Sequence, residues 1–570
     1  MRPEEGPIEE HIRAYRALLQ RGALRLALLE DGHARMRSSL HPLASSEEVD
    51  VSAFLYSARR LPECMATVDR VVMGKSDDAL RSSGLIEPSR CRQVRAQARR
   101  RLTLFDGQKT LAAHVCSPSD LDDLIPALTC FQMEWNKMHS KLARSDLGRG
   151  IASSSGRVLE SGEEIRKALA ISRDDWDMIR KTWGGSWAER LSAIAAGPKE
   201  ITVELASQDP GRYRESMVGW LADLLAHFRD MDIEGRPVYF VSSNDHSLAN
   251  LLSGFAAKNR KEILARLLED ERLKKRWERL KDDDPALGEN LLYYSMLAYV
   301  QSDVSRFAAL RSAEEEVGIR RYDISRFVDL KAQIIEIAKL KPDRMDCRLA
   351  IEGATSLEDS RSLILNVDYP LGLAAHHLLT QAMERLGILS GVYVMGKAAT
   401  IYGRLGDVMI PKVVFDMHSR RLFTFKNCFT LRDVRRHLRD SAVFDDQKAV
   451  TVRGTFLHNK EAMEEFRRED YNSIEMEAGP YLSAVQESSQ GRGEKGSFEE
   501  GDEMPFEFGM LHYASDTPYS PRVSLLSKGL GYEGIEATYA CSLAILQRIL
   551  EDEVRRVRRE KGRKILDPSS

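Results

Sequence analysis

Two carboxylates that flank a methionine form the most suggestive chemical group in the sequence. Glu475 and Glu477 lie on either side of Met476, and a small apolar run from Ala478 predicts the start of a helix. Residues two apart cannot share one face of a helix, so the spacing favours an extended or turning segment. In such a segment both carboxylates can face one pocket, accept hydrogen bonds and stabilise a developing positive charge. The alternative is a solvated surface.

Other segments in the C-terminal half share a position at or near the ends of predicted strands. Open α/β sheets bind their ligands at that edge. Besides the acidic pair, these segments are residues 366–372, 395–411, 453–457 and 513–518. We therefore expect a ligand site in the C-terminal half.

The elements that must position this site change in type along the chain. Residues 1–195 are expected to form a mainly helical domain, because apolar residues such as Ile125, Leu128 and Phe131 recur at helical spacing. The next region, 196–340, is expected to be helical with a small α/β segment, which has strands at 201–205 and 237–241. The polar residues 242–247 then predict either an anion site or a simple helix cap.

Residues 341–555 predict an α/β domain. A strand over 362–367, a helix over 373–386 and a strand over 391–395 make a βαβ unit, which implies a parallel sheet. Further strands are predicted at 347–351, 408–415, 421–425, 449–452 and 506–513, with a closing helix at 534–555. Residues 487–504, rich in Gly, Ser and Glu, predict a flexible insertion, and 556–570 a basic tail.

The composition is typical of a soluble globular protein. Apolar residues make up 43% of the chain and charged residues 30%, and a net charge of −3 gives no sign of nucleic acid or an anionic membrane as partner. The seven cysteines include no Cys-x-x-Cys pair, which favours a reducing compartment and argues against zinc or disulfides. With no apolar leader and no window of about 20 apolar residues, we expect a cytoplasmic protein without a membrane span.

One basic run and three histidines have more than one interpretation. The run predicts either a phosphate-binding face or, more commonly, a solvated helix face; it consists of Arg90, Arg92, Arg95, Arg99, Arg100 and Arg101. His376, His377 and His458 belong to no metal-binding pattern, so no metal is expected and these residues stay unassigned.

In their order and spacing, the strand-end segments resemble the nucleoside phosphorylase superfamily, which includes purine nucleoside and uridine phosphorylases, methylthioadenosine nucleosidase and AMP nucleosidase. The resemblance covers about residues 345–555. It rests on Glu475–Ala478 and Ser515–Asp516, with Gly396–Asp407 as support. It implies a mixed, largely parallel sheet flanked by helices, and a homo-oligomer.

The family's chemistry explains these residue types. Its members break the bond between a base and ribose through a ribosyl cation. The resemblance assigns the ribose hydroxyls to Glu477, with Met476 packed against the sugar. It makes Asp516, beside Ser515, the general acid that protonates a departing purine. Phe456 corresponds to the aromatic side chain that stacks on the base, with core packing as the alternative.

The phosphate-binding turn departs from the family pattern. Where the family has Gly-Ser/Thr-x-Gly-Gly, residues 396–400 read Gly-Lys-Ala-Ala-Thr. Lys397 can attract an anion as a point charge, Thr400 can supply a hydroxyl, and Arg404 and Arg453 are further candidates for phosphate groups. The family's early phosphate loop and the nucleosidases' early glutamate are not recognisable near residue 345. The sequence therefore leaves open whether the nucleophile is water or inorganic phosphate, and whether the substrate carries its own phosphates. No cofactor is expected.

Three functions compete. The residues favour an enzyme that cleaves the N-glycosidic bond of a purine nucleoside or nucleotide, by hydrolysis or phosphorolysis. A regulatory protein that senses a nucleotide through a degenerate pocket is the alternative. A scaffold whose helical half binds a protein or nucleic acid is the third, and only the basic run supports it.

Overall fold

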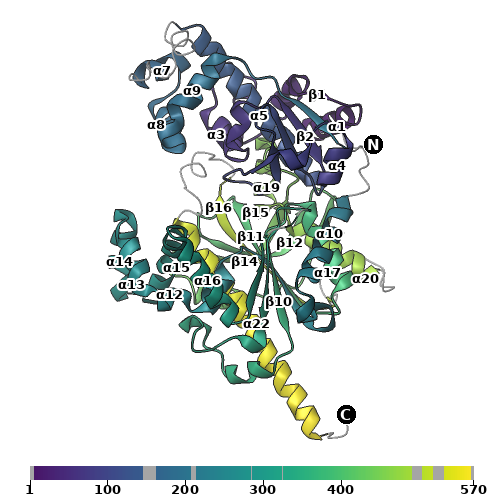
Figure 1. Ribbon diagram of the computed structural model, residues 1–570, viewed down its shortest axis with the longest axis vertical. Helices are drawn as coiled ribbons and strands as arrows, with labels where there is room; N and C mark the ends of the chain where they lie inside the picture. Colours follow the sequence, from purple (N-terminus) through teal and green to yellow (C-terminus); the bar gives the residue numbers. More distant parts are fainter. Residues whose placement is uncertain are drawn as a thin grey trace.

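A computed structural model describes residues 6–145, 162–206, 213–283, 285–323, 325, 327–490, 504–517 and 532–566. The chain forms two units, each built on its own β-sheet, and the N-terminal unit lies against one end of the larger C-terminal sheet (Figure 1). No helix in the described parts of the chain is long and apolar enough to cross a membrane.

The N-terminal unit is built on a six-stranded sheet of order β1-β6-β2-β5-β4-β3. Its strands are β1 (Leu24–Arg25), β2 (Arg70–Gly74), β3 (Arg92–Val94), β4 (Thr103–Phe105), β5 (Thr110–His114) and β6 (Thr202–Leu205). Its helices are α1 (Pro7–Leu19), α2 (Glu30–Arg35), α3 (Val51–Arg59), α4 (Asp77–Ser82), α5 (Pro118–Ala143), α7 (Gly162–Leu169), α8 (Arg173–Trp183) and α9 (Trp187–Ala196).

The prediction of a helical first domain missed this sheet. Its strands are two to five residues long, too short for an alternating pattern to show. Buried β2 reads as an apolar run without alternation, as expected for a strand covered on both faces. The predicted boundary at residue 195 falls within this sheet, because β6 pairs with β1 and β2.

The C-terminal unit is built on a ten-stranded mixed sheet of order β13-β12-β14-β15-β11-β7-β10-β9-β8, with β16 paired to both β11 and β12. Its strands are β7 (Pro237–Ser243), β8 (Ile319–Tyr322), β9 (Ala332–Glu336), β10 (Leu363–Asp368), β11 (Ile388–Thr400), β12 (Val408–Asp416), β13 (Arg421–Thr424), β14 (Val443–Thr451), β15 (Tyr471–Glu475) and β16 (Glu507–Asp516).

Helices cover both faces of this sheet (Figure 1). Alternate residues of β7 enter different cores: Val238 and Phe240 pack with α10, α17 and α20, whereas Tyr239 and Val241 pack with α11–α16 and α22. The helices are α10 (Tyr213–His227), α11 (Ser247–Ser253), α12 (Phe255–Lys258), α13 (Arg260–Leu268), α14 (Glu271–Asp283), α15 (Pro285–Gln301), α16 (Val304–Glu316), α17 (Leu373–Arg385), α18 (Leu431–Arg435), α19 (Lys460–Arg468), α20 (Ala478–Gln490) and α22 (Tyr532–Leu566).

The βαβ unit of β10, α17 and β11 forms as predicted. The two strands are not neighbours, because β7 lies between them and runs parallel to both. Since β7, β8 and β9 come from the region predicted as separate, the expected boundary at residue 340 also lies inside one sheet.

Four predicted details differ or lie outside the described residues. Residues 347–351 do not form a strand; Cys347–Leu349 is a 3-10 turn. β11 continues past Gly396 to Thr400, because it pairs with β16 and β15 beyond that glycine. α22 extends to Leu566, so most of the predicted basic tail is helical. Of the predicted insertion, α20 includes residues up to 490, and 491–503 lie outside the described residues.

Candidate functional site

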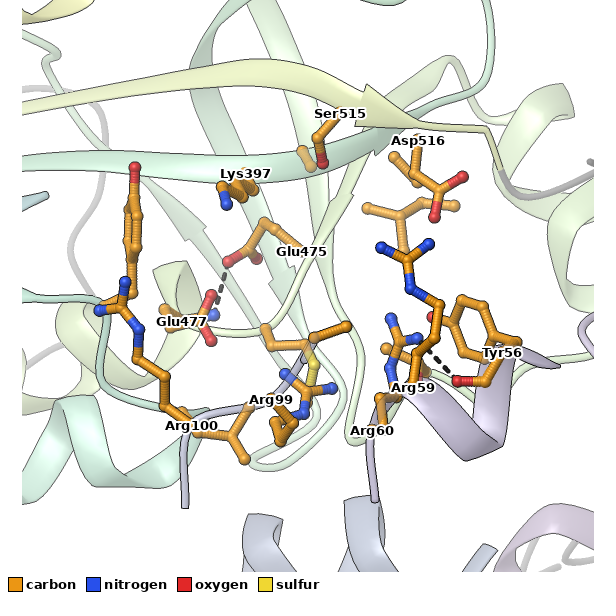
Figure 2. Close-up of a pocket in the computed structure, with 18 of the residues that line it drawn as sticks. Tyr56, Arg59, Arg60, Arg99, Arg100, Lys397, Glu475, Glu477, Ser515 and Asp516 are labelled. Atoms are coloured by element: carbon orange, nitrogen blue, oxygen red, sulfur yellow. Dashed lines mark hydrogen bonds between the residues drawn. The ribbon is translucent and has the colours of Figure 1, made fainter. Parts of the chain in front are cut away.

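A cavity of about 620 Å³ lies where the two units meet. The carboxyl ends of β11, β15 and β16 form much of its C-terminal wall, and residues near the end of α3 and after β3 form the facing wall. Among the predicted site residues, those that line the cavity are Lys397, Met476, Glu477, Ser515 and Asp516 (Figure 2).

The acidic pair lies in the turn between β15 and α20, as its spacing predicted. Glu475 is the last residue of β15, and its Oε2 accepts hydrogen bonds from the backbone N–H groups of Glu477 and Ala478, each over 2.6 Å. Its other oxygen accepts the hydroxyl of Thr451. Glu475 thus caps α20, whereas Glu477 faces the cavity, where its Oε1 accepts from Gly372 N–H over 3.2 Å.

Burial raises the pKa of both carboxyl groups. Burial and the charge of Glu477 raise the pKa of Glu475 to about 8. Burial raises the pKa of Glu477 to about 7, while the N–H of Gly372 and the charge of Arg99 limit the rise. Both carboxyl groups therefore hold their protons at a higher pH than a solvated glutamate does.

A register shift at the end of β16 brings Ser515 and Asp516 to the cavity. Ala398 of β11 pairs with Ala514 and Ala399 with Asp516, so Ser515 has no partner on β11. Such bulges re-aim side chains and are common beside active sites. Asp516 Oδ1 accepts the N–H of Thr517 over 2.8 Å, and the side chain lies close enough to Tyr56 and Arg60 for its charge to act on both.

Lys397 extends from β11 into the cavity, so it stays open to solvent although protein surrounds it (Figure 2). Its Nζ lies 5.6 Å from the centre of the Tyr369 ring. Burial, with the charges of Arg100 and Arg99, lowers the pKa of Lys397 to about 8. The ammonium is therefore charged at neutral pH and destabilised by its surroundings.

The predicted phosphate turn does not exist as a turn. Gly396 and Thr400 belong to β11. The Thr400 hydroxyl donates to Asn472 Oδ1 over 2.9 Å and accepts from Gly403 N–H, so it is used within the fold. Arg404 is exposed and does not line the cavity. Arg453 also lies outside it, where its Nη1 forms an ion pair with Glu9 over 3.0 Å.

Phe456 is a core residue rather than a base-stacking one. Its side chain is 1% exposed and belongs to the hydrophobic core of the N-terminal unit, where its ring lies 5.5 Å from that of Tyr56 and 6.1 Å from that of His33. His458, two residues on, lines the cavity, and its Nδ1 lies 2.6 Å from Ser39 Oγ. The segment around Phe456 therefore anchors the two units to each other.

The basic run contributes to the cavity. The run is not a solvated helix: it begins at Arg90, the end of a 3-10 turn, passes through β3 and continues through residues 95–102 without a helix. Arg95, Arg99 and Arg100 line the cavity with Arg59 and Arg60, at the end of α3. The sequence pattern indicated the run but not Arg59 and Arg60. The only signal for this pair is that two arginines follow each other after an apolar helix.

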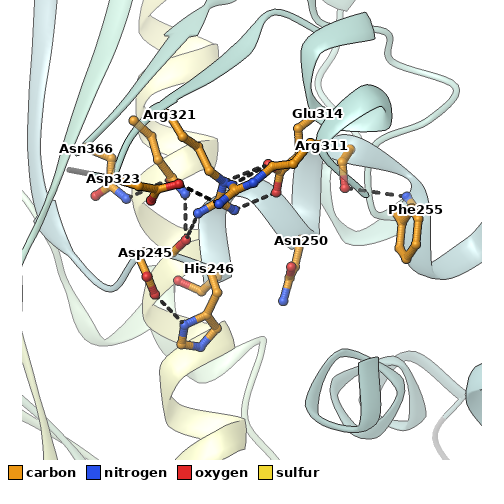
Figure 3. Close-up of polar contacts among 12 residues, drawn as sticks. Asp245, His246, Asn250, Phe255, Arg311, Glu314, Arg321, Asp323 and Asn366 are labelled. Carbon is orange, nitrogen blue, oxygen red and sulfur yellow. Dashed lines mark hydrogen bonds and ion pairs between the residues drawn. The ribbon is translucent and has the colours of Figure 1, made fainter. Parts of the chain in front are cut away.

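A polar network at the carboxyl end of β7 supports the rim of the cavity (Figure 3). The Asp245 carbonyl accepts from Arg321, and its carboxylate forms an ion pair over 3.0 Å with Lys331, which lines the cavity. Arg321 is held in turn by Glu314. At 242–247 the capping interpretation is supported, because Asn244 Oδ1 accepts from Ser247 N–H over 2.6 Å at the start of α11.

Within the described part of the chain, no group of three His, Cys, Asp or Glu side chains could hold a metal ion.

Comparisons with known proteins match parts of this chain to solved structures at low identity. No curated protein matches the sequence. A methylthioadenosine/S-adenosylhomocysteine nucleosidase from Neisseria meningitidis, solved with methylthio-immucillin-A, is 15% identical over 42% of this chain and 92% of its own, with a TM-score of 0.28. An S-adenosylhomocysteine nucleosidase from Streptococcus pyogenes is 10% identical over 56% and 97%, with a TM-score of 0.30.

A methylthioadenosine phosphorylase from an Antarctic soil metagenomic library is 12% identical over 34% of this chain and 73% of its own, with a TM-score of 0.25. The sequence model of a family of unknown function (DUF6909) matches residues 26–551, so the protein belongs to that family.

Proposed function

We propose that the protein cleaves the N-glycosidic bond of a purine nucleoside or nucleotide. One observation carries this proposal: Met476 and Glu477, after β15, and Ser515 and Asp516, at the end of β16, line a single cavity. Its volume of about 620 Å³ suits a small molecule of nucleotide size.

Glu477 is the proposed acceptor for the ribose hydroxyls. One of its oxygens is oriented by Gly372 N–H, and the carboxylate is largely enclosed. As the bond to the base breaks, positive charge develops on the sugar ring, and a fixed carboxylate stabilises it. Because burial raises the pKa of Glu477 to about 7, we expect kcat/KM to rise with pH through neutrality.

Asp516 is the proposed general acid. It donates a proton to the ring nitrogen of the departing purine, which takes the electron pair of the broken bond, while water or phosphate adds to C1′ of the sugar. Ser515 lies beside it in the bulge and is available as a hydrogen-bond partner for the base.

A protein that binds a nucleotide without turnover is the second candidate. Two features favour it: Phe456 is buried in a core instead of the cavity, and residues 396–400 form strand instead of a phosphate turn. The same pocket would then bind the ligand, and the N-terminal unit would report its presence.

Release of free base, followed by chromatography and mass spectrometry, tests the first candidate against the second. The panel is adenosine, methylthioadenosine, guanosine, AMP and ATP, each with and without phosphate. We expect Asp516→Asn to lower kcat/KM for the best purine by about 100- to 10,000-fold. Asp343→Asn, on the exposed surface, is the matched control. Saturable binding without base release from any compound would instead establish the sensor.

A further inference from the structure

The cavity wall supplied by the N-terminal unit is strongly cationic. Of the ten described residues that this unit contributes to the lining, five are arginines and none is acidic. We call these five residues the arginine wall: Arg59, Arg60, Arg95, Arg99 and Arg100. Figure 2 shows four of them, Arg59, Arg60, Arg99 and Arg100, opposite the strands that carry Lys397 and Asp516, with Glu475 and Glu477 between Lys397 and Arg99.

Part of this positive charge is paired with two acids, one from each unit. Arg99 forms an ion pair with Asp123 over 2.5 Å, and Arg100 forms one with Asp368. Neither acid lines the cavity. These pairs place both guanidinium groups beside acids outside the cavity, and the N-terminal unit adds no anion to the described lining.

Other cations are less well compensated. Arg60 lies 3.4 Å from the centre of the Tyr56 ring, and its Nε, like that of Arg99, has no hydrogen-bond partner among the described residues. Burial and the charge of Arg99 lower the pKa of Arg60, and the charges of Asp123 and Asp516 oppose this effect only in part. Burial and the charges of Arg100 and Arg99 likewise lower the pKa of Lys397, which lies on the opposite wall of the cavity. Clustered cations with lowered pKa values are stabilised when an anion binds among them.

We propose that the arginine wall and Lys397 bind the phosphate groups of the substrate, which is therefore a nucleoside 5′-phosphate. The inference rests on the proposed function in one respect. If Glu477 holds the 2′- and 3′-hydroxyls of ribose, the 5′ carbon is the remaining position for a phosphate. Arginine suits this ligand because its planar guanidinium can donate two parallel hydrogen bonds to phosphate oxygens.

The arrangement assigns a role to the N-terminal unit. Glu477 and Asp516 come from the C-terminal unit, whereas every arginine of the wall comes from the N-terminal unit. A nucleoside without phosphate would contact mainly the C-terminal residues. A nucleotide would also bridge the two units, so the substrate class is set by contacts between them.

Substrate preference tests the proposal. We expect kcat/KM for base release to be at least about 10-fold higher for AMP than for adenosine. Lys397→Gln and Arg95→Gln should each lower kcat/KM for AMP by about 10- to 100-fold, and that for adenosine by less than about threefold. Arg95 is an exposed residue in the loop after β3, so its replacement should not disturb folding. Arg90→Gln is the matched control, because Arg90 is an exposed arginine of the same run outside the cavity.

Calorimetry gives a readout that does not depend on turnover. Because Lys397 has a pKa of about 8, phosphate beside it should raise that pKa, and binding of AMP at pH 8 should take up protons. The uptake is measured in buffers of different ionisation enthalpy. It should disappear in Lys397→Gln and persist in Arg90→Gln.

The outcomes separate this inference from the proposed function. Equal kcat/KM for adenosine and AMP, with unchanged AMP kinetics in Lys397→Gln and Arg95→Gln, would refute the phosphate site and leave the glycosidase in place. Stimulation of adenosine cleavage by inorganic phosphate, with ribose 1-phosphate as product, would also overturn it, because the cations would then hold the nucleophile. Tighter binding of AMP than adenosine, with proton uptake but no base release, would support the phosphate site and refute the glycosidase.

Discussion

Glu477→Gln should separate the catalytic effect of this carboxylate from its effect on stability. The amide oxygen of glutamine can still accept the hydrogen bond from Gly372 N–H, so the turn keeps its anchor. What the variant removes is the negative charge. Two charge-assisted hydrogen bonds to ribose, worth about 1.5–3 kcal/mol each, correspond to a loss of about 100- to 10,000-fold in kcat/KM.

The effect on stability has the opposite sign. Burial raises the pKa of Glu477 from 4.5 to about 7, so the folded state favours the protonated form. Such a group weakens the fold as pH rises from 4.5 to 7, because the unfolded chain gives up its proton first. A tenfold change in the acidity constant corresponds to about 1.4 kcal/mol, which makes the full cost about 3 kcal/mol. Glutamine avoids this cost.

The assay is urea unfolding of wild type and variant at pH 5 and pH 8, together with base release from the best substrate. Relative to wild type, the stability of Glu477→Gln should increase by about 2 kcal/mol between the two pH values. Glu465→Gln, an exposed glutamate on α19, should show no such change. Stability differences that do not depend on pH, or activity within about threefold of wild type, would refute the reasoning.

Three further changes test other parts of the structure. Gly372 has a φ of +54°, and a Cβ there would lie 2.4 Å from Ser119 Oγ, so Gly372→Ala should lower unfolding free energy by about 2 kcal/mol or more. Phe456→Leu should lower the free energy of unfolding by about 1 kcal/mol and leave KM unchanged. A raised KM with unchanged stability would instead support a base-stacking role for Phe456. Burial lowers the pKa values of His11 and His458 from 6.5 to about 4. Each histidine should therefore destabilise the fold below pH 6.5, by up to about 3 kcal/mol. Equal melting temperatures at pH 5 and pH 7 would contradict this.

Local patterns identified the turn that carries the acidic pair. The extended or turning segment that carries the two carboxylates and the start of α20 follow one another within a few residues, and each is favoured by its immediate neighbours. The same holds for β10, α17 and β11, whose periodic apolar positions persist over whole elements. Such patterns could be predicted because they depend on the residue types along the chain.

The residues around Gly396 show where local reasoning failed. A glycine followed by a change in pattern predicts the end of a strand, yet β11 continues to Thr400 because β16 and β15 supply partners for its backbone there. Those partners lie far along the chain. Phe456 was misplaced for a similar reason: the core that buries it is made by the other unit.

The sequence by itself determined the acidic turn, the strand at 506–513 that leads to Ser515 and Asp516, and the presence of a basic run. Only the tertiary structure decided that Arg95, Arg99 and Arg100 face Glu477 and Lys397 across one cavity. The physical reason is that secondary structure follows from the side chains of neighbouring residues. A pocket between two units, by contrast, is set by packing between surfaces whose residues lie hundreds of positions apart.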